Sequence, residues 1–589
     1  MGDIPAVNGT CNGRHGDELL LKEAPVENLR PLKVIVVGAG FSGILMAIRI
    51  PERLRNVELV VYEKNDGVGG VWWLNRYPGV ACDIPSHSYQ YSFAPNPHWS
   101  NLYAPGSEIQ KYLEGVAERF GAMRFIKTRH RVDHGEWDDA AKKWRVKVTN
   151  LATGETFEDA ANVLITARGQ LNNVSWPNIP GLDTFQGKVM HSGEWDTSYD
   201  FRNKRIGVIG NGSSAIQIIP NLQKVEGAKL TCFMRSPTWI ASPFGDQGMI
   251  ELGLDPAETA FSDEQRQKLA ANPDELFKVR KVFETGGNII HDSTIRGTPM
   301  QIAFQESFRE SMQAKLATRP DLLALLIPAF APGCRRLTPG KGFLESLLEP
   351  NVTVVSSPIA QITPTGVETK TPTTATETAH HPLDVLVCAT GFHVSSPPPF
   401  PLLGLNRLPL SARWHKRAES YLSLAVDGFP NLLMLFGPNS AIGSGSLTKI
   451  LEAEADYILA AVRKLQKEDY ASMAPRRARV RDFMAYVDGY FKRTVYTDQC
   501  RSWYTRDGKV VGLWPGSTLH ALETLRNPRW EDWEYESLEG EGGNALRWLG
   551  NGNSEPGDPS WYINPDEVEV PVEGRPEDNK RYRARPWSY

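Results

Sequence analysis

Two segments of the chain carry glycines at the spacing that binds the phosphates of a dinucleotide. The first is GAGFSG, residues 38–43, and the second is GNGSSA, residues 210–215. Each follows an apolar run and opens a helix-like segment, and glycine there lets backbone N–H groups approach a pyrophosphate at the positive helix N-terminus. The pattern predicts cofactor contacts from both loops, at Gly38, Gly40, Phe41, Ser42 and Gly43 and at Gly210, Gly212, Ser213, Ser214 and Ala215.

The residue that ends the following strand distinguishes the two nucleotides. Glu63 comes twenty residues after Gly43, where a carboxylate accepts hydrogen bonds from a ribose diol. The second unit instead ends its strand with Arg235 and Ser236, which suit a 2′-phosphate that an acidic residue would repel. We therefore expect NADPH in the second unit, the alternative being an arginine solvated at a strand end.

Two dinucleotides in one chain indicate electron transfer between them. Nicotinamide delivers hydride, and FAD in the first unit is the expected acceptor. Gly69 and Gly70 are followed by Trp72 and Trp73. Paired glycines let the backbone approach a cofactor, and aromatic rings can wall a flat ring system. For either tryptophan alone, a place in an aromatic core patch explains the residue equally well.

The connector between the two loops is unusual for a linker. It reads FQGKVMHSGEWD over residues 185–196, with Phe185, Gly187, His191 and Trp195 at fixed spacing and Asp196 after them. In these residues the chain resembles the class B flavin monooxygenases, specifically the Baeyer–Villiger monooxygenases, whose fingerprint is FxGxxxHxxxW followed by Pro or Asp. The resemblance covers residues from about 32 to 540, and the stretch 500–517 is similar to fungal members.

Further segments match the family pattern and imply cofactor contacts. They are residues 67–72, 76–79 and 82–83 on the flavin side, the arginine segment 332–336, and the late segments 389–392 and 437–438. The resemblance implies these additional cofactor-binding residues: Gly70, Val71, Trp72, Asp83, Tyr89, Arg335, Thr390, Gly391 and Gly437. One position departs from the pattern, because Arg168 stands where many relatives have the Thr of Ala-Thr-Gly. That departure questions the local loop contacts but not the class.

The resemblance also implies a defined reaction. NADPH reduces FAD, O2 adds to give a C4a-peroxyflavin, and the peroxide attacks a ketone, so that an ester or lactone forms. A peroxide anion needs a permanent cation beside it, and an arginine side chain cannot be deprotonated.

The match gives that cationic role to Arg336, with Asp83 as the carboxylate that positions it, the alternative for Arg336 being a surface salt bridge. Arg335 is expected to face NADPH. His191, the third residue of the catalytic set, is expected to orient the two units at a hinge rather than to act as an acid or base, with Trp195 packing the same joint.

Other functions stay open. Heteroatom oxygenation, hydroxylation or epoxidation would use the same chemistry, although the arginine pair favours ketones. A non-catalytic sensor that binds NADPH and FAD is a further alternative. A disulfide reductase would need a redox-active cysteine pair, but the six cysteines are scattered and form no CxxC, which argues against a disulfide framework, a dithiol centre and a zinc site.

These residues require an α/β fold with two Rossmann-like dinucleotide-binding domains, because strand, glycine turn, helix and strand occur twice. A charged, helix-forming stretch at about 250–330 is expected as a helical insertion, which begins with a capping box of Ser262 and Gln265. The strand-like residues 384–392 are expected to return the chain to the first sheet. The expected segments are an N-terminal arm (1–30), an FAD-binding domain (31–180 and 386–540), an NADPH-binding domain (181–385) and a C-terminal tail (541–589).

Composition excludes several classes of partner. The 589 residues include 41% hydrophobic residues and carry a net charge of −4, which gives no general attraction to nucleic acid or to an anionic membrane. The sequence shows no membrane-length apolar run and no secretory pattern, so a reducing, cytoplasmic compartment is expected. The expected partners are O2 and a bulky small-molecule ketone of secondary metabolism or of steroid type. The sequence does not define the ketone, the regiochemistry, the role of the tail or the oligomeric state.

Overall fold

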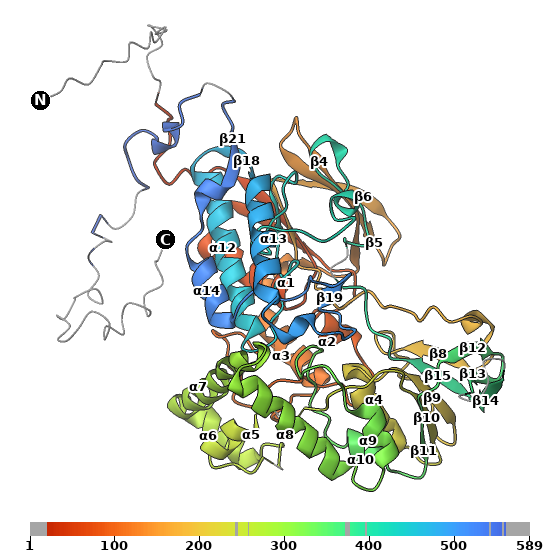
Figure 1. Ribbon diagram of the computed structural model, residues 1–589. Coiled ribbons are helices and arrows are strands. Elements are labelled where there is room, and N and C mark those ends of the chain that lie inside the picture. Colours follow the sequence, from red (N-terminus) through yellow and green to blue (C-terminus); the bar gives the residue numbers. More distant parts are fainter. Residues whose placement is uncertain are drawn as a thin grey trace, which may run out of the picture.

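The computed structural model describes residues 21–241, 245–256, 258–371, 377–394, 397–540, 543–555, 559–560 and 563. Two five-stranded parallel sheets form its frame, each with helices against it (Figure 1). In Figure 1 the first sheet and its helices fill the upper part of the view, the second sheet lies at the lower right, and a group of helices in green lies below. The expected α/β fold with two nucleotide-binding frames is therefore confirmed.

The first sheet has the order β17-β7-β1-β2-β3. Its strands are β1 (Leu32–Val37), β2 (Val57–Tyr62), β3 (Ile126–Lys127), β7 (Val163–Thr166) and β17 (Leu432–Met434). β1 reads LKVIVV and is buried at five of its six residues, which is typical of a parallel strand covered on both faces.

The two faces of the first sheet are covered by different layers. Val34 and Val36 pack with α1 (Phe41–Arg53) and α12 (Leu447–Lys467). Their neighbours Ile35 and Val37 point the other way, into a core with Trp144. That core belongs to the mixed sheet β16-β4-β5-β6, whose strands are Leu402–Leu403, His130–Asp138, Lys143–Asn150 and Thr156–Ala161. β16 pairs with β4 in parallel, and the other two pairings are antiparallel.

The second sheet has the order β11-β10-β9-β15-β8. Its strands are β8 (Lys188–His191), β9 (Arg205–Ile209), β10 (Lys229–Phe233), β11 (Val352–Val355) and β15 (Val385–Cys388), and α4 (Ser213–Gln223) follows β9. The prediction that residues 384–392 return the chain to the first sheet is wrong, since β15 pairs in parallel with β9 and β8. The chain re-enters the first sheet only at β17, and the predicted boundary after residue 385 falls inside β15. A strand that reads VLVC fits either parallel sheet, so its composition cannot identify its neighbours.

The predicted helical insertion comprises α5 (Asp246–Glu251), α6 (Asp263–Ala271), α7 (Pro273–Ile289), α8 (Pro299–Lys315) and α9 (Pro320–Leu326). The predicted capping box at the start of α6 is confirmed. The Ser262 side chain accepts from the Gln265 backbone N–H, and the Gln265 side chain accepts from the Ser262 backbone N–H.

The remaining helices and strands close the two units. After α12 come β18 (Tyr470–Pro475), α13 (Arg477–Phe491), the hairpin β19 (Thr505–Arg506) and β20 (Lys509–Val510), α14 (Thr518–Arg526) and β21 (Trp533–Ser537). Elsewhere lie α2 (Val71–Leu74), α3 (Gly106–Arg119), α10 (Phe343–Ser346), α11 (Leu410–Arg413) and the sheet of β12 (Ile359–Thr363), β13 (Gly366–Lys370) and β14 (Thr378–Pro382). In the described part of the chain, no helix has the length and apolar character needed to cross a membrane.

Candidate active site

A cavity of about 970 Å³ extends along the carboxyl ends of both parallel sheets. Its wall includes Gly38 and Gly40 from the first glycine loop and Gly212 and Ser213 from the second. We call it the main cavity. Ligands of open α/β sheets bind at the carboxyl ends of the strands, so one continuous space serves both predicted nucleotide sites.

The first glycine loop forms a cradle that side chains would fill. A Cβ atom at Gly38, where φ is +105°, would lie 2.7 Å from the carbonyl oxygen of Ala167. A Cβ atom at Gly70 would lie 3.0 Å from the Cα of Gly40. The bare backbone at this end of the cavity fits a bound pyrophosphate, as the sequence predicts for FAD.

Glu63 is buried at the end of β2, with 4% of its surface exposed. Its Oε2 accepts a hydrogen bond from the Ala39 N–H at 2.7 Å, and its Oε1 accepts from the Asn65 N–H at 2.8 Å. Oε1 also accepts from the Asn65 side-chain amide at 2.6 Å, so the second lone pair of Oε2 is the acceptor left for a ribose hydroxyl. Bonds from within residues 39–65 thus hold the Glu63 carboxylate, while the Glu63 backbone is bonded to Lys127 and His130 of the neighbouring strands.

The predicted cofactor-binding residues divide into two groups. Those that line the main cavity are Gly38, Gly40, Phe41, Ser42, Glu63, Gly70, Val71, Trp72, Asp83, Tyr89, Gly212, Ser213, Ser214 and Gly391. Those outside its lining are Gly43, Gly210, Ala215, Arg235, Ser236, Arg335, Thr390 and Gly437.

Several residues of the second group have packing roles. A Cβ atom at Gly43 would lie 1.8 Å from the Gly38 carbonyl oxygen, and one at Gly210 would lie 2.4 Å from that of Ala389. These two glycines let a helix or a neighbouring strand approach the loop closely. The Thr390 hydroxyl donates to the Ser175 carbonyl at 2.6 Å, which fastens the segment after β15 to the preceding connector.

The strand end predicted for the 2′-phosphate lies at the surface. Arg235 is exposed immediately after β10, and the Ser236 carbonyl accepts a hydrogen bond from the Asn211 side chain in the second glycine loop. Arg335 comes from a distant segment, and its Nη1 donates to the Pro237 carbonyl at 3.1 Å. The structure therefore brings two arginines to the same strand end.

Arg336 and Asp83 form the predicted ion pair, and both line the main cavity. Arg336 donates from Nε and Nη2 to the two Asp83 oxygens at 2.8 Å and 2.6 Å. Burial alone would lower the pKa of Arg336, but the Asp83 carboxylate outweighs it and raises that pKa well above its ordinary value. The guanidinium, which also lies beside the Tyr504 hydroxyl, is thus a permanent cation with further N–H donors.

The fingerprint histidine lies away from these charges. His191 is the last residue of β8 and is fully buried, and its Nδ1 accepts from the Gly193 N–H at 3.0 Å. Its ring meets Trp176 and Phe392 edge-on, with centroids 5.4 Å and 5.7 Å away. Desolvation lowers the pKa of His191, so the imidazole is neutral at physiological pH.

The other fingerprint residues serve packing. Only glycine fits at position 187, because a Cβ atom there would lie 2.4 Å from the Asp384 carbonyl oxygen. The prediction that Trp195 shares the joint of His191 is wrong: Trp195 stacks on Phe201 at 5.5 Å and packs against the core of the second unit. The chain turns tightly between His191 and Glu194, and the two rings have different aromatic neighbours.

One expectation from the cysteines is also wrong. Cys334 and Cys500 form a disulfide, with their Cα atoms 6.3 Å apart and a sequence separation of 166. Scattered cysteines in a sequence carry no information about distance in the fold, so spacing could not reveal the pair. Cys82, Cys232 and Cys388 are free and buried, and Cys11 lies outside the described residues.

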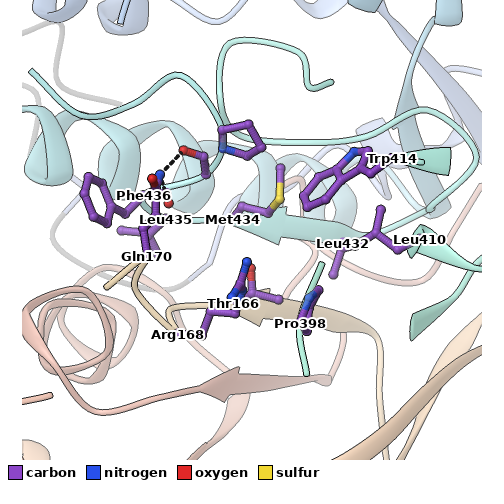
Figure 2. A pocket seen from close by; sticks show the side chains of 12 residues that line it. Thr166, Arg168, Gln170, Pro398, Leu410, Trp414, Leu432, Met434, Leu435 and Phe436 are labelled. Atoms are coloured by element: carbon purple, nitrogen blue, oxygen red, sulfur yellow. Dashed lines mark hydrogen bonds between the residues drawn. The ribbon is translucent and has the colours of Figure 1, made fainter. Parts of the chain in front are cut away.

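Arg168 lies where the main cavity meets a second cavity of about 20 Å³ (Figure 2). Gln170 in the same wall donates through Nε2 to the carbonyl oxygens of Phe436 at 3.1 Å and Gly437 at 2.7 Å. Burial lowers the pKa of Arg168 to about 10, so its charge persists at neutral pH. The departure at this position therefore adds a partly buried cation near the first glycine loop.

Two parts of the cavity wall are not predicted from the sequence. One is Trp503, which lies three residues after the disulfide cysteine Cys500. The other is the face of α7 that carries Phe283, Glu284, Gly286 and Gly287. A glycine in a helix interior costs about 1 kcal/mol relative to alanine. Two adjacent glycines in the sequence of α7 therefore indicate that another group lies close to the helix backbone there.

Comparisons with known proteins agree with this geometry. Residues 31–254 match the family described as flavin-binding monooxygenase-like. The chain is 37% identical to the FAD-binding monooxygenase tazF of Aspergillus terreus, over 95% of this chain and 100% of that protein. It is 32% identical to a Baeyer–Villiger monooxygenase of Streptomyces coelicolor, over 84% of this chain and 91% of the other. The fold resembles that of an oxidized steroid monooxygenase bound to NADP, with a TM-score of 0.69, 27% identity, and coverage of 86% of this chain and 100% of that one.

Proposed function

The chain belongs to the flavin-binding monooxygenase family, and we propose that it inserts one oxygen atom of O2 beside the carbonyl group of a ketone to give an ester or a lactone. It is an enzyme of the Baeyer–Villiger type that uses FAD and NADPH. When bound, FAD takes hydride from NADPH, activates O2 and supplies the oxygen atom.

The residues at the two ends of the main cavity bind and orient the cofactors. The glycine cradle of Gly38, Gly40 and Gly70 holds the FAD pyrophosphate, and Glu63 binds its ribose. Gly212 and Ser213 bind the NADPH pyrophosphate, and Arg235 and Ser236 bind its 2′-phosphate. Trp72 and Tyr89, joined by a hydrogen bond of 3.1 Å, wall the space for the flavin ring.

The observation that carries the proposal is the Arg336–Asp83 pair in the cavity wall. Asp83 occupies two of the guanidinium donors at 2.8 Å and 2.6 Å and leaves others to face the reacting oxygen. A fixed cation stabilises negative charge on activated oxygen far better than water does, because it needs no reorganisation during the reaction. The side chain therefore serves oxygen insertion rather than hydride transfer.

His191 has a positioning role in this proposal. Its neutral ring lies between Trp176 of the connector and Phe392 of the segment after β15, and both segments lead towards the first unit. Burial and edge-on ring contacts define one arrangement of these segments. The ring touches neither Arg336 nor either glycine loop, which favours a hinge over acid–base chemistry.

The cavity supports a bulky ketone as the substrate. The main cavity has a volume of about 970 Å³, and α7 contributes to its wall Gly286 and Gly287, which carry no side chains. At Gly286 a Cβ atom would meet nothing within 4 Å. We propose a polycyclic ketone of secondary metabolism or of steroid type, in keeping with the resemblance to tazF and to the steroid monooxygenase.

The test is mass spectrometry of the products from a panel of ketones and organic sulfides, incubated with the holoenzyme, NADPH and air. We expect bulky cyclic ketones to gain one oxygen atom, with fragmentation that identifies an ester or lactone. Isotopic label from ¹⁸O2 must appear in the product. Oxygen transfer to the sulfides alone, or NADPH oxidation that no ketone stimulates, contradicts the proposal.

A further inference from the structure

The disulfide between Cys334 and Cys500 joins two segments that both reach the cofactor sites. Cys334 directly precedes Arg335 and Arg336, and Cys500 directly precedes Arg501. Trp503, two residues beyond Arg501, lines the main cavity, and Tyr504 lies beside Arg336. A covalent bond therefore fixes the segment 500–504 to the arginine segment.

The bond also places Arg501 beside Arg335. The two arginines follow bonded cysteines whose Cα atoms are 6.3 Å apart, and they lie close enough that Arg501, after burial, lowers the pKa of Arg335. Arg335 in turn donates to the carbonyl of Pro237, which follows Arg235 and Ser236. Three arginines from three distant segments thus gather near the end of β10.

Nearby carboxylates are engaged elsewhere. Asp498 forms an ion pair with Arg296 at 2.8 Å, and its other oxygen accepts from the Ala331 N–H at 2.9 Å. Neither Arg335 nor Arg501 forms an ion pair with an Asp or Glu among the described residues, and the Arg335 Nε is buried without a hydrogen-bond partner there. Adjacent cations without counter-charges repel each other, and a bound phosphate relieves this repulsion.

We propose that Arg501 is a further NADPH-binding residue, which the Cys334–Cys500 disulfide holds at the 2′-phosphate beside Arg235 and Arg335. The phosphate carries close to two negative charges near neutral pH, so it needs more than the single arginine at the strand end. The site at the end of β10 is therefore not formed by a local sequence motif alone. The disulfide brings to it a residue from beyond α13.

The proposal makes NADPH affinity sensitive to thiols. A small dithiol reduces the S–S bond in a two-electron exchange. It yields the thiols of Cys334 and Cys500, which gain the two protons, while the dithiol closes into its own disulfide. Cys500 is partly exposed and gives the reductant access. Once the disulfide is reduced, the segment that carries Arg501 is no longer tied to the segment that carries Arg335.

The first experiment measures binding of adenosine 2′,5′-bisphosphate, NADP+ and NAD+ to the FAD-loaded protein by calorimetry. We expect Arg501→Ala to weaken the binding of the two ligands that carry a 2′-phosphate by about tenfold or more, and to leave the binding of NAD+ unchanged. Arg506→Ala is the matched control, because Arg506 is a half-exposed arginine of the neighbouring hairpin that lies 3.9 Å from Asp507. Wild-type affinity of Arg501→Ala for the bisphosphate overturns the assignment.

The second experiment tests the disulfide itself. Thiol titration of the denatured, unreduced protein must find four of the six cysteines reactive; six reactive thiols contradict the proposal. Cys500→Ser, and the wild type treated with dithiol, should lose bisphosphate affinity as Arg501→Ala does, and Arg501→Ala should lose nothing further on reduction. If the disulfide were purely structural, its loss would weaken the binding of NAD+ and FAD as much as that of the bisphosphate, and that result would also overturn the proposal.

Discussion

The two nucleotide units begin alike and are completed differently. In the first, Glu63 is buried at the end of β2, and the hydrogen bonds to its carboxylate come from Ala39 and Asn65, which lie close to it in sequence. In the second, Arg235 is exposed at the end of β10, and the neighbouring arginine at that strand end, Arg335, comes from a segment a hundred residues later in the chain.

The difference matches the task of each cofactor. A local, buried, prebonded site suits FAD, which stays bound through each turnover, whereas an open site assembled from distant segments suits NADPH, which arrives as a substrate. Interactions within one short segment survive motion between units, while interactions between segments change with it. Changes in the first unit should therefore alter stability, and changes in the second should alter affinity.

The largest effect is expected from Glu454, a fully buried residue of α12 under the first sheet. Burial raises the pKa of Glu454 from 4.5 to about 8, although the hydrogen bond from the Phe436 N–H at 2.9 Å opposes this. The folded state therefore keeps a proton that the unfolded chain releases. Stability from this group is complete below about pH 4.5 and is lost as the pH rises to about 8.

Glu454→Gln should remove this pH dependence and add several kcal/mol, on the order of 1.4 per pKa unit, to the free energy of unfolding at about pH 9. Denaturant unfolding of the holoenzyme at about pH 6 and pH 9 measures it. Asp456→Asn, at an exposed position of the same helix, should change neither value. Equal stability of wild type and Glu454→Gln at the higher pH would show that the carboxyl group is ionised at no cost.

The next effect concerns Arg336, where the two units meet. Arg336→Ala should still allow NADPH to reduce the flavin, since hydride transfer needs no cation at the oxygen site, but oxygen insertion should fall by about 10²–10³-fold. Anaerobic stopped-flow reduction and aerobic product yield separate the two steps. The product yield of Asp83→Asn should lie between those of the wild type and Arg336→Ala, because the arginine is kept but loses the carboxylate that positions it. Wild-type ketone turnover by Arg336→Ala would refute the assignment.

The contrast between the units also explains what the sequence could predict. The two strand–glycine loop–helix units and the capping box depend on residues within a few turns of one another, and local spacing identified these elements correctly. The Arg336–Asp83 pair came instead from the family resemblance, since 253 residues separate its members.

The errors share one cause. The place of β15 in the second sheet, the disulfide and the packing of Trp195 depend on which distant segments become neighbours, and a single sequence does not encode that in its spacing. The missed wall residues, Trp503 and the α7 glycines, are of the same kind. The sequence therefore predicted the locally built site better than the assembled one.

Arg235→Ala tests the assembled site with a smaller effect. A bidentate contact with the 2′-phosphate at a partly exposed position is worth roughly 2–3 kcal/mol, so the Michaelis constant for NADPH should rise about thirty- to two-hundredfold. NADH kinetics should hardly change. Arg202→Ala, an exposed arginine of the same unit paired with Asp200, is the control. If the wild type uses NADH as well as NADPH, the second unit has been misread.

Ser236 should show the smallest effect and thereby separate charge from hydrogen bonding at that strand end. Its carbonyl accepts a hydrogen bond from Asn211 in the glycine loop, and its hydroxyl can donate one to the phosphate. A neutral hydrogen bond contributes about 0.5–1.5 kcal/mol, which is roughly a two- to tenfold rise in the NADPH Michaelis constant for Ser236→Ala. Raising the salt concentration should weaken NADPH binding by the wild type and by Ser236→Ala alike, because both keep Arg235. It should weaken NADPH binding by Arg235→Ala less. A loss from Ser236→Ala as large as that from Arg235→Ala would mean that shape and hydrogen bonding, rather than the arginine charge, select the phosphate.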